Sequence, residues 1–476
     1  MDTSVEAAKN GAADVIENVT FAEIRLGQKA SLSKVLTKTD IELFAAVSGD
    51  YNPTHLDTAF AEDSNLHHIV GHRMWGGSLI SGVLGSLLPG PGTVYLGQDL
   101  RFLRPVGVGD AVTATVIVKE KRDGSKSVVF DCRCVNQLGE DVVIGTAEVI
   151  APEKKVRRAR VELPQVQMIR HDGYELLMHK CDAIPPVSVA VVHPCDESSL
   201  KGAVEAAQAG LINPVLIGPE AKIRSVAEQY GVDLADYRIV GCEHSHAAAE
   251  IGVALARSGE CASVMKGSLH TDELMAEVVR RDTGLRTGRR LSHVFVMNVP
   301  TYPKPLLITD AAINIYPTLE DKVDILQNAI ELAQVLGQEQ PKVAILSAVE
   351  TVNPKISSTL EAAALCKMAD RGQIRGGVLD GPLAFDNAIS AEAAKTKGIT
   401  SPVAGNVDIL LVPDMEAGNM LAKQLSFLAN ADAAGIVLGA RVPIILTSRA
   451  DNVRTRLASC AVAVLVADAR RRAAKM

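Results

Sequence analysis

The chain has 476 residues, of which 47% are hydrophobic and 22% charged, and a formal net charge of −7. This length exceeds a single hydrophobic core, so two or three domains are expected in a chain with the composition of an ordinary soluble protein. The acidic balance argues against general affinity for nucleic acid, and the longest apolar run near a terminus, Leu457 to Ala467, is too short to cross a bilayer.

The amino terminus has scattered acids and lacks the apolar core of a signal peptide, so residues 1–18 are expected to form a disordered leader. The eight cysteines show neither a CxxC pair nor a Cys/His ligand cluster. Cys132 and Cys134 fall on one face of an expected strand, which is too extended for them to pair easily. These features predict reduced thiols, no metal site and a cytoplasmic location.

Residues 19–151 have the pattern of a first domain. Phe21 to Leu36 indicates an opening strand region, and Thr39-Asp40 supplies a helix start before a run of apolar residues. A loop follows, and Asp57 to Glu62 predicts a short helical piece.

The loop is forced by Gly49 and by Asn52-Pro53, because proline fixes its own φ and disfavours a helical residue before it. On a helix, Asp50 and His55 would point about 140° apart, whereas a tight turn can fold them around one water molecule. An acid and an imidazole so placed suit the addition of water to an activated double bond. Taken alone, such a pair is more often a loop aspartate bonded to its own backbone beside a surface histidine.

The surrounding residues carry a resemblance. Phe44-Ala45-Ala46-Val47-Ser48-Gly49-Asp50-Tyr51-Asn52-Pro53-Thr54-His55, followed by Ala59-Phe60, resembles the hydratase motif of the MaoC-like (R)-specific enoyl-CoA hydratases. The resemblance implies a hot-dog fold, with Asp50 and His55 as the catalytic pair and Asn52 as a substrate-binding residue.

Ile69 to Leu88 is apolar on every side and rich in small residues, which predicts a helix buried all round. It stops at Pro89-Gly90-Pro91-Gly92. The resemblance places a thioester carbonyl at its start, near His72, where free amides and the helix dipole stabilise an oxyanion. It also implies substrate binding at Gly76.

Two positions on this helix leave alternatives open. Family members usually have His-Gly-Met where this chain has His72-Arg73-Met74, so Arg73 either blocks approach to the backbone or adds positive charge to the substrate site. Ser81 matches a family position near the catalytic water, but its hydroxyl could equally bond back to its own helix.

Four alternating segments, separated in part by Asp123-Gly124 and Leu138-Gly139 turns, complete this domain. They are Val94–Arg104, Ala111–Lys121, Lys126–Asn136 and Asp141–Ile150. An antiparallel meander curled round one helix leaves an edge and an apolar rim, so a dimer or a multiple of dimers is expected.

Residues 152–184 indicate a linker, beginning with the charged, proline-led run Pro152 to Arg160. From residue 185 to 476, strands alternate with amphipathic helices, which predicts an α/β domain with a parallel sheet covered on both faces. Its ligands should lie beyond the carboxyl ends of the strands. The expected strands are Ser188–Val192, Pro214–Ile217, Arg238–Val240, Ser263–Met265, His293–Val296, Leu306–Thr309, Val343–Leu346, Ile409–Val412, Gly435–Leu438 and Ile444–Leu446, and the longer helices include Glu197–Ala209, Asp321–Leu336, Ser357–Ala369, Gly418–Leu428 and Asn452–Ala467.

The fragments at those strand ends resemble the phosphate acetyl/butyryltransferase family. They are Lys266–Asp272, Arg289–His293, Thr309–Asn314, Leu379–Asp386 and Leu446–Asp451. The whole chain resembles fused proteins described as bifunctional enoyl-CoA hydratase/phosphate acetyltransferases. This implies coenzyme A thioesters and inorganic phosphate as substrates, with no permanently bound cofactor.

Acyl transfer to phosphate needs a cationic cradle, a group that handles the thiol proton, and neutralisation of an oxyanion. Ser448 and Arg449 are expected between a strand and a helix, where amides, hydroxyl and guanidinium could face one oxygen. Arg290 or Arg289 would be a second clamp, Lys266 a substrate-binding cation, and Asp310 a residue for positioning or proton transfer. Each could singly be a helix cap, a solvated charge or a turn residue.

One departure concerns the proton-handling group. The resemblance places an acid seven positions after the serine, where this chain has Thr455, and the Ser-Arg-Ala-Asp form is closer to the butyryltransferase branch. Proton handling and acyl-chain length therefore stay open. Two alternatives remain as well: an acyl-CoA-sensing second domain, and a hot-dog domain that serves only as a dimerisation scaffold.

Overall fold

The computed structural model describes residues 15–64, 67–159, 166, 172–447 and 451–474. The chain divides into two compact units, residues 1–168 and 169–476, and the division falls within the expected linker. None of the described helices combines the length and apolar character that a membrane span requires.

Parts of the expected leader and linker are ordered together, so the expectation for residues 15–18 and 157–159 was wrong. Strand β1 (Val15–Glu17) pairs antiparallel with β7 (Arg157–Ala159). Asn18 is buried and its side chain donates to the carbonyls of Pro91 and Lys154. Strands of three residues are too short to show hydrophobic alternation in the sequence, and hydrogen bonds from buried Asn18 fix the chain beside them.

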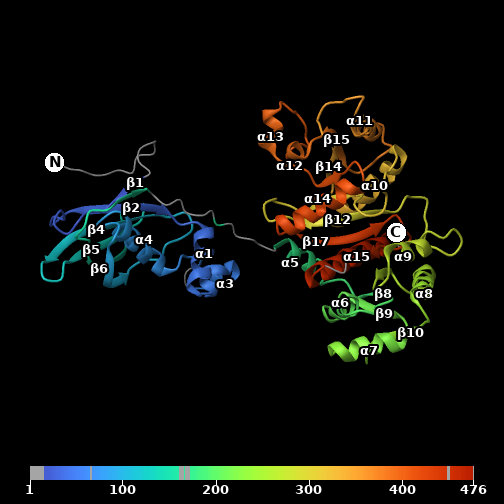
Figure 1. The fold of residues 1–476 in the computed structure, drawn as a ribbon, viewed down its shortest axis with the longest axis horizontal. Helices are drawn as coiled ribbons and strands as arrows, with labels where there is room; N and C mark the ends of the chain where they lie inside the picture. Colours follow the sequence, from blue (N-terminus) through green and yellow to red (C-terminus); the bar gives the residue numbers. More distant parts are fainter. Residues whose placement is uncertain (1–14, 65–66, 160–165, 167–171, 448–450, 475–476) are drawn as a thin grey trace. The chain divides into compact units, whose positions relative to one another are not determined.

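The first unit is a five-stranded antiparallel sheet in the order β2-β4-β5-β6-β3 (Figure 1). Its strands are β2 (Lys29–Val35), β3 (Val94–Phe102), β4 (Ala111–Arg122), β5 (Ser127–Val135) and β6 (Asp141–Ile150). The expected strands are confirmed, but the meander is incomplete: β3 crosses to the far edge and pairs with β6. The hot-dog class is confirmed.

Helix α4 (Arg73–Ser86) packs on this sheet, with Ile80, Val83 and Leu84 buried in a core that includes Phe130 of β5. It is shorter than the expected 69–88, and it is not buried all round. Ser78, Ser81 and the 48% exposed Met74 lie on a face left open in the single chain. Of the small residues that suggested complete burial, Gly76 and Gly77 are buried, whereas Ser78 and Ser81 lie on the exposed face.

Three short helices precede α4: α1 (Lys38–Ser48), α2 (Pro53–Leu56) and α3 (Thr58–Asp63). The capping box of α1 is formed by Thr37 and Asp40, so the N-cap lies two residues before the expected Thr39. It ends at Gly49, whose φ of 74° is the left-handed conformation that glycine tolerates best.

The second unit contains an eleven-stranded sheet in the order β10-β9-β8-β11-β18-β17-β12-β13-β16-β14-β15 (Figure 1). Its strands are β8 (Val187–Val192), β9 (Ile212–Gly218), β10 (Arg238–Gly241), β11 (Ser263–Lys266), β12 (Ser292–Asn298), β13 (Leu306–Thr309), β14 (Lys342–Leu346), β15 (Val378–Leu383), β16 (Ile409–Leu411), β17 (Asp432–Leu438) and β18 (Ile444–Ile445). Most neighbours are parallel, but β12 runs antiparallel to both β13 and β17, and β17 antiparallel to β18.

The sheet is thus mixed rather than wholly parallel, and its two parallel blocks run in opposite directions. Strand β15 was missed because its Asp380-Gly381-Pro382 sequence has the residues of a turn. Apolar clusters lie on both faces of the sheet, as expected. The helices are α5 (Asp172–His179), α6 (Glu197–Gln208), α7 (Glu220–Tyr230), α8 (Ser245–Ser258), α9 (Thr271–Val278), α10 (Leu319–Val335), α11 (Ser357–Asp370), α12 (Phe385–Ile389), α13 (Ala391–Thr396), α14 (Met415–Leu428) and α15 (Val453–Ala473).

Candidate active sites

The loop after α1 holds the expected catalytic pair of the first domain. The Asn52 side-chain oxygen accepts from the amide and hydroxyl of Thr54 and so caps α2, which carries His55. The Asn52 amide in turn donates to the Asp50 carboxylate at 3.3 Å. Asn52, expected to bind substrate, therefore shapes the turn that brings Asp50 and His55 together.

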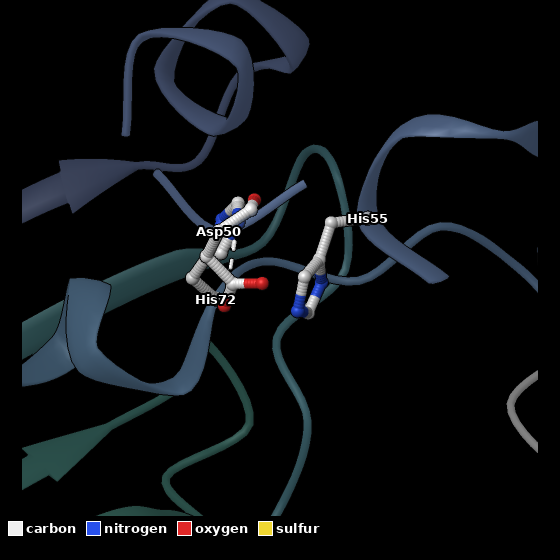
Figure 2. A group of neighbouring side chains, drawn as sticks. All are labelled: Asp50, His55 and His72. Carbon is white, nitrogen blue, oxygen red and sulfur yellow. Dashed lines mark hydrogen bonds and ion pairs between the residues drawn. The ribbon is translucent and has the colours of Figure 1, made fainter. Parts of the chain in front are cut away.

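Asp50 and His55 converge rather than diverge (Figure 2). A ligating atom of each, together with one of His72, lies within 4.8 Å of the others. Two hydrogen bonds of about 2.8 Å that meet at one water molecule span about this distance. The His55 Nδ1 lies 2.7 Å from the Val70 carbonyl and must carry the proton to donate to it, which leaves the Nε2 lone pair as a base.

His72 is a third member of this group, which the sequence analysis did not predict. Its side chain is 3% exposed, its Nε2 donates to the Asp50 backbone carbonyl at 3.1 Å, and its ring lies 4.0 Å from that of His55. The Nδ1 has no hydrogen-bond partner among the described residues. The signal in the sequence that could have indicated His72 is its position as a polar residue directly before an apolar helix.

The other expected residues of this domain have different surroundings. The guanidinium of Arg73 donates to the Phe102 carbonyl at the end of β3, at 3.3 Å. Gly76 is buried, and a Cβ there would lie 3.0 Å from Val143 of β6, so this glycine serves close packing. Ser81 is exposed, and no bond back to its helix occurs in the described structure; Ser78 makes that kind of bond instead.

In the second domain, the reversal of strand direction separates residues that the sequence placed at one sheet edge. Lys266 ends β11 and Thr447 follows β18, and these strands are parallel. Asp310 follows β13, which runs the opposite way. Lys266 is buried and its ammonium lies 3.4 Å from the Gly267 carbonyl. Ser448 and Arg449 lie outside the described residues, so their expected site is not tested.

Asp310 is 2% exposed, and its carboxylate accepts four hydrogen bonds. They come from the amides of Ala312, Ile313 and Asn314 and from the Asn314 side chain. Burial raises the pKa of Asp310, while these hydrogen bonds act in the opposite direction. A carboxylate whose oxygens are engaged in this way is suited to positioning the loop rather than to moving a proton.

Arg289 and Arg290 lie at a cleft of about 660 Å³ between the start of α9 and the start of α10. The Arg290 Nε donates to the Asn314 side chain at 2.8 Å and lies 3.4 Å from the Asp321 carboxylate. Arg289 binds Glu331 at 2.6 Å, and this contact raises its pKa. Arg286 lines the same cleft, and so do the acidic residues Asp272, Glu320, Asp321 and Asp324, so guanidinium and carboxylate groups face each other there.

Two domain matches agree with this architecture. The family model for phosphate acetyl/butaryl transferase matches residues 243–464, and that for a MaoC like domain matches residues 21–135. The phosphate acetyltransferase of Rhizobium meliloti is 66% identical over 303 residues, covering 64% of this chain and 96% of that protein.

Two solved structures are similar as well. A branched-chain phosphotransacylase from Enterococcus faecalis is 30% identical, with a TM-score of 0.53, covering 59% of this chain and 99% of that chain. The R-hydratase PhaJ1 from Pseudomonas aeruginosa is 44% identical, covering 32% of this chain and 99% of that chain, with a TM-score of 0.32.

A hot-dog domain joined to a mixed α/β domain, with these two matches, defines a two-domain protein of the phosphate acyltransferase class with an attached MaoC-like domain. The chain belongs to the phosphate acetyl/butyryltransferase family. Both resemblances that the sequence motifs indicated are thereby confirmed.

Proposed function

We propose that the chain is a bifunctional coenzyme A enzyme. The first domain would hydrate a 2-enoyl-CoA to an (R)-3-hydroxyacyl-CoA, and the second would transfer an acyl group from acyl-CoA to inorganic phosphate. The observation that carries the hydratase half is the convergence of Asp50 and His55 within reach of one water. Neither reaction requires a permanently bound cofactor, because coenzyme A and phosphate are substrates.

In the hydration, the Asp50 carboxylate and the His55 Nε2 each accept a hydrogen of one water molecule. Its oxygen bonds to C3 as the C2=C3 π bond breaks, and a proton held on the pair is delivered to C2. No side chain caps the start of α4 in the described structure, so its amides can stabilise the negative charge on the thioester oxygen. The Arg73 guanidinium, held on Phe102, adds positive charge near this end of the helix.

In the transfer, a phosphate oxygen attacks the thioester carbonyl carbon, the C–S bond breaks, and the CoA sulfur leaves and takes up a proton. We assign Ser448, Arg449 and Lys266 to the reacting phosphate and oxyanion. We assign Arg289 and Arg290, which precede β12 and lie toward the other sheet edge, to a phosphate of CoA itself. A long ligand with charges at one end and a thioester at the other can contact two separate sites.

The open faces of the first domain support a homo-oligomer with an even number of copies. Strand β3 lies at the edge of the sheet, and its Val94 and Leu96 are 53% and 54% exposed. An apolar edge strand is a template for pairing with a second copy. We also propose a cytoplasmic location, in agreement with the eight free cysteines.

The test is acyl-CoA turnover by the full-length protein. We expect loss of crotonyl-CoA absorbance on addition of protein, and release of CoA thiol from acetyl- to hexanoyl-CoA only when phosphate is present. Asp50→Asn should lower hydration by about 10²- to 10⁴-fold and leave transfer unchanged. Tight CoA binding without phosphate-dependent release would identify the second domain as a sensor. Absence of hydration in the wild-type protein would leave the first domain as a scaffold.

A further inference from the structure

A second cationic cavity lies behind the segment that carries Arg289 and Arg290. It has a volume of about 420 Å³ and shares Thr287, Gly288 and Arg289 with the cleft assigned above to CoA. Its other walls include the loop after β17, with Arg441, and the last turns of α15, with Arg470. One chain segment thus separates two cavities that both present arginine.

Positive charge exceeds negative charge at this cavity. Glu331 neutralises Arg289 at 2.6 Å. The Arg470 guanidinium donates to the carbonyls of Ala440 and Arg441, which are neutral acceptors. The Arg441 guanidinium has no ion-pair partner within the described part of the chain. Loss of solvent lowers the pKa of Arg470, Glu331 acts to raise it, and the neighbouring charge of Arg289 lowers it further.

The arginines that follow in the sequence behave differently, so the excess is not a general property of this helix end. Arg471 and Arg472 both bind Asp468, at 2.5 and 2.6 Å, on α15. Basic residues in a last helical turn are favourable for the helix dipole alone. That effect does not explain why Arg470 projects into a cavity with two further arginines while its neighbours have their own carboxylate.

A smaller, largely apolar cavity adjoins the cationic one. It has a volume of about 200 Å³ and shares Asn328 and Arg470 with it. Its lining includes Val335, Leu438 and Val466, and also Glu331, whose carboxylate binds Arg289. A binding site with a cationic mouth and an apolar floor is complementary to an anion that carries a short hydrocarbon chain. An inorganic anion would contact only the cationic part of this site.

The two cavities lie far from the loop that precedes α15. Arg470 is near the carboxyl end of that helix, and at about 1.5 Å per residue the helix places it roughly 25 Å from Val453. The site is therefore separate from the strand end at Thr447. Its link to the substrate cleft is Arg289, which lines both.

We propose that these adjoining cavities bind a small effector with an anionic head, either carboxylate or phosphate, and a short alkyl chain. The arginines bind the head and the apolar lining takes the chain. Because Arg289 lines both sites, occupancy would alter the substrate cleft on the other side of the same segment. The binding itself does not depend on the assigned reactions.

Calorimetric titration of the full-length protein with hexanoate, in the presence of saturating CoA, tests this proposal. We expect saturable binding that CoA does not displace, weakened at least fivefold in Arg441→Gln and in Ala473→Glu, which places a carboxylate at the apolar cavity. Arg472→Gln, which removes an ion pair outside both cavities, should bind as the wild type does.

Inorganic phosphate, which lacks the chain, should bind at least fivefold more weakly than hexanoate, and hexyl phosphate at least as tightly as hexanoate. Equal affinity for inorganic phosphate would overturn the role of the apolar cavity. Displacement of hexanoate by CoA, unchanged affinity in both variants, or no binding at all would overturn the proposal as a whole.

Discussion

The ring of His72 stacks on that of His55, with centroids 4.0 Å apart and planes tilted by 35°. The same His72 donates its Nε2 proton to the backbone carbonyl of Asp50. One buried side chain therefore contacts both members of the proposed catalytic pair. We infer that His72 positions them, since its own nitrogen is already engaged and its ring is enclosed.

The substitution His72→Phe tests this role, because it keeps an aromatic ring against His55 and removes the donor to Asp50. We expect kcat for hydration to fall about 10- to 100-fold with little change in KM, since a loosened pair is misplaced relative to the substrate. Initial rates with crotonyl-CoA measure both constants. Wild-type kcat in a folded variant would contradict the positioning role.

A second prediction concerns the stability of the hot-dog sheet at Gly145 of β6. A Cβ at this position would lie 1.9 Å from the Asp99 carbonyl oxygen of β3. Because that atom belongs to the backbone, relieving the clash would require the two strands to shift. Gly145→Ala should therefore destabilise the first domain by about 3 kcal/mol. Trp75 is the single tryptophan of the chain and is buried in this domain, so its fluorescence during urea unfolding reports the change.

The matched control is Gly97→Ala on β3, where a Cβ meets nothing within 4 Å. This variant should unfold within about 1 kcal/mol of the wild type. Phosphate-dependent CoA release should survive in both variants under conditions that unfold the first domain, because that activity is assigned to the other unit. Equal stability of the two variants would show that β3 and β6 can separate freely.

The sequence predicted the elements better than their connections. Most strands were predicted to within a residue or two from their continuous apolar runs. This is possible because burial and capping depend on residues that are close in the sequence. The reversal of strand direction at β12 and β17 could not be predicted from the sequence, since a buried strand has the same composition in either direction. That reversal is what separates Asp310 from Lys266.

Some residues of the candidate sites could likewise be predicted from the sequence, and others could not. Asp50 and His55 could be predicted because turn chemistry fixes them within one loop. His72 could not, because its contact with that loop depends on how α4 packs against the sheet. For Gly76 the role in substrate binding stays a prediction, since a glycine required for packing at Val143 looks the same in sequence as one required by a ligand.

His293 of β12 predicts a pH dependence of stability. Its ring is completely buried, both nitrogens lack partners among the described residues, and burial lowers its pKa to about 3. The unfolded chain binds a proton near pH 6.5 and the folded chain does not, so stability falls as the pH drops below about 6.5. Between pH 7 and pH 5 this residue should cost about 2 kcal/mol.

The variant His293→Leu removes that titration. Its free energy of unfolding, followed by circular dichroism in urea, should fall about 2 kcal/mol less than that of the wild type between pH 7 and pH 5. Absolute stability at pH 7 is not the readout, because a leucine repacks the site. Parallel pH curves for the two proteins would mean that His293 gains a proton in the folded state at an ordinary pKa.

Asp310→Asn tests whether the buried carboxylate serves to position its loop. Each oxygen of Asp310 accepts two hydrogen bonds, and an amide would turn its NH₂ group toward two donors. We expect a loss of about 3 kcal/mol in the second domain and a fall in phosphate-dependent CoA release. Asp414→Asn is the control, because Asp414 caps α14 through one oxygen and asparagine caps equally well. If Asp310→Asn matched this control in stability while losing activity, Asp310 would act on the proton and not on the loop.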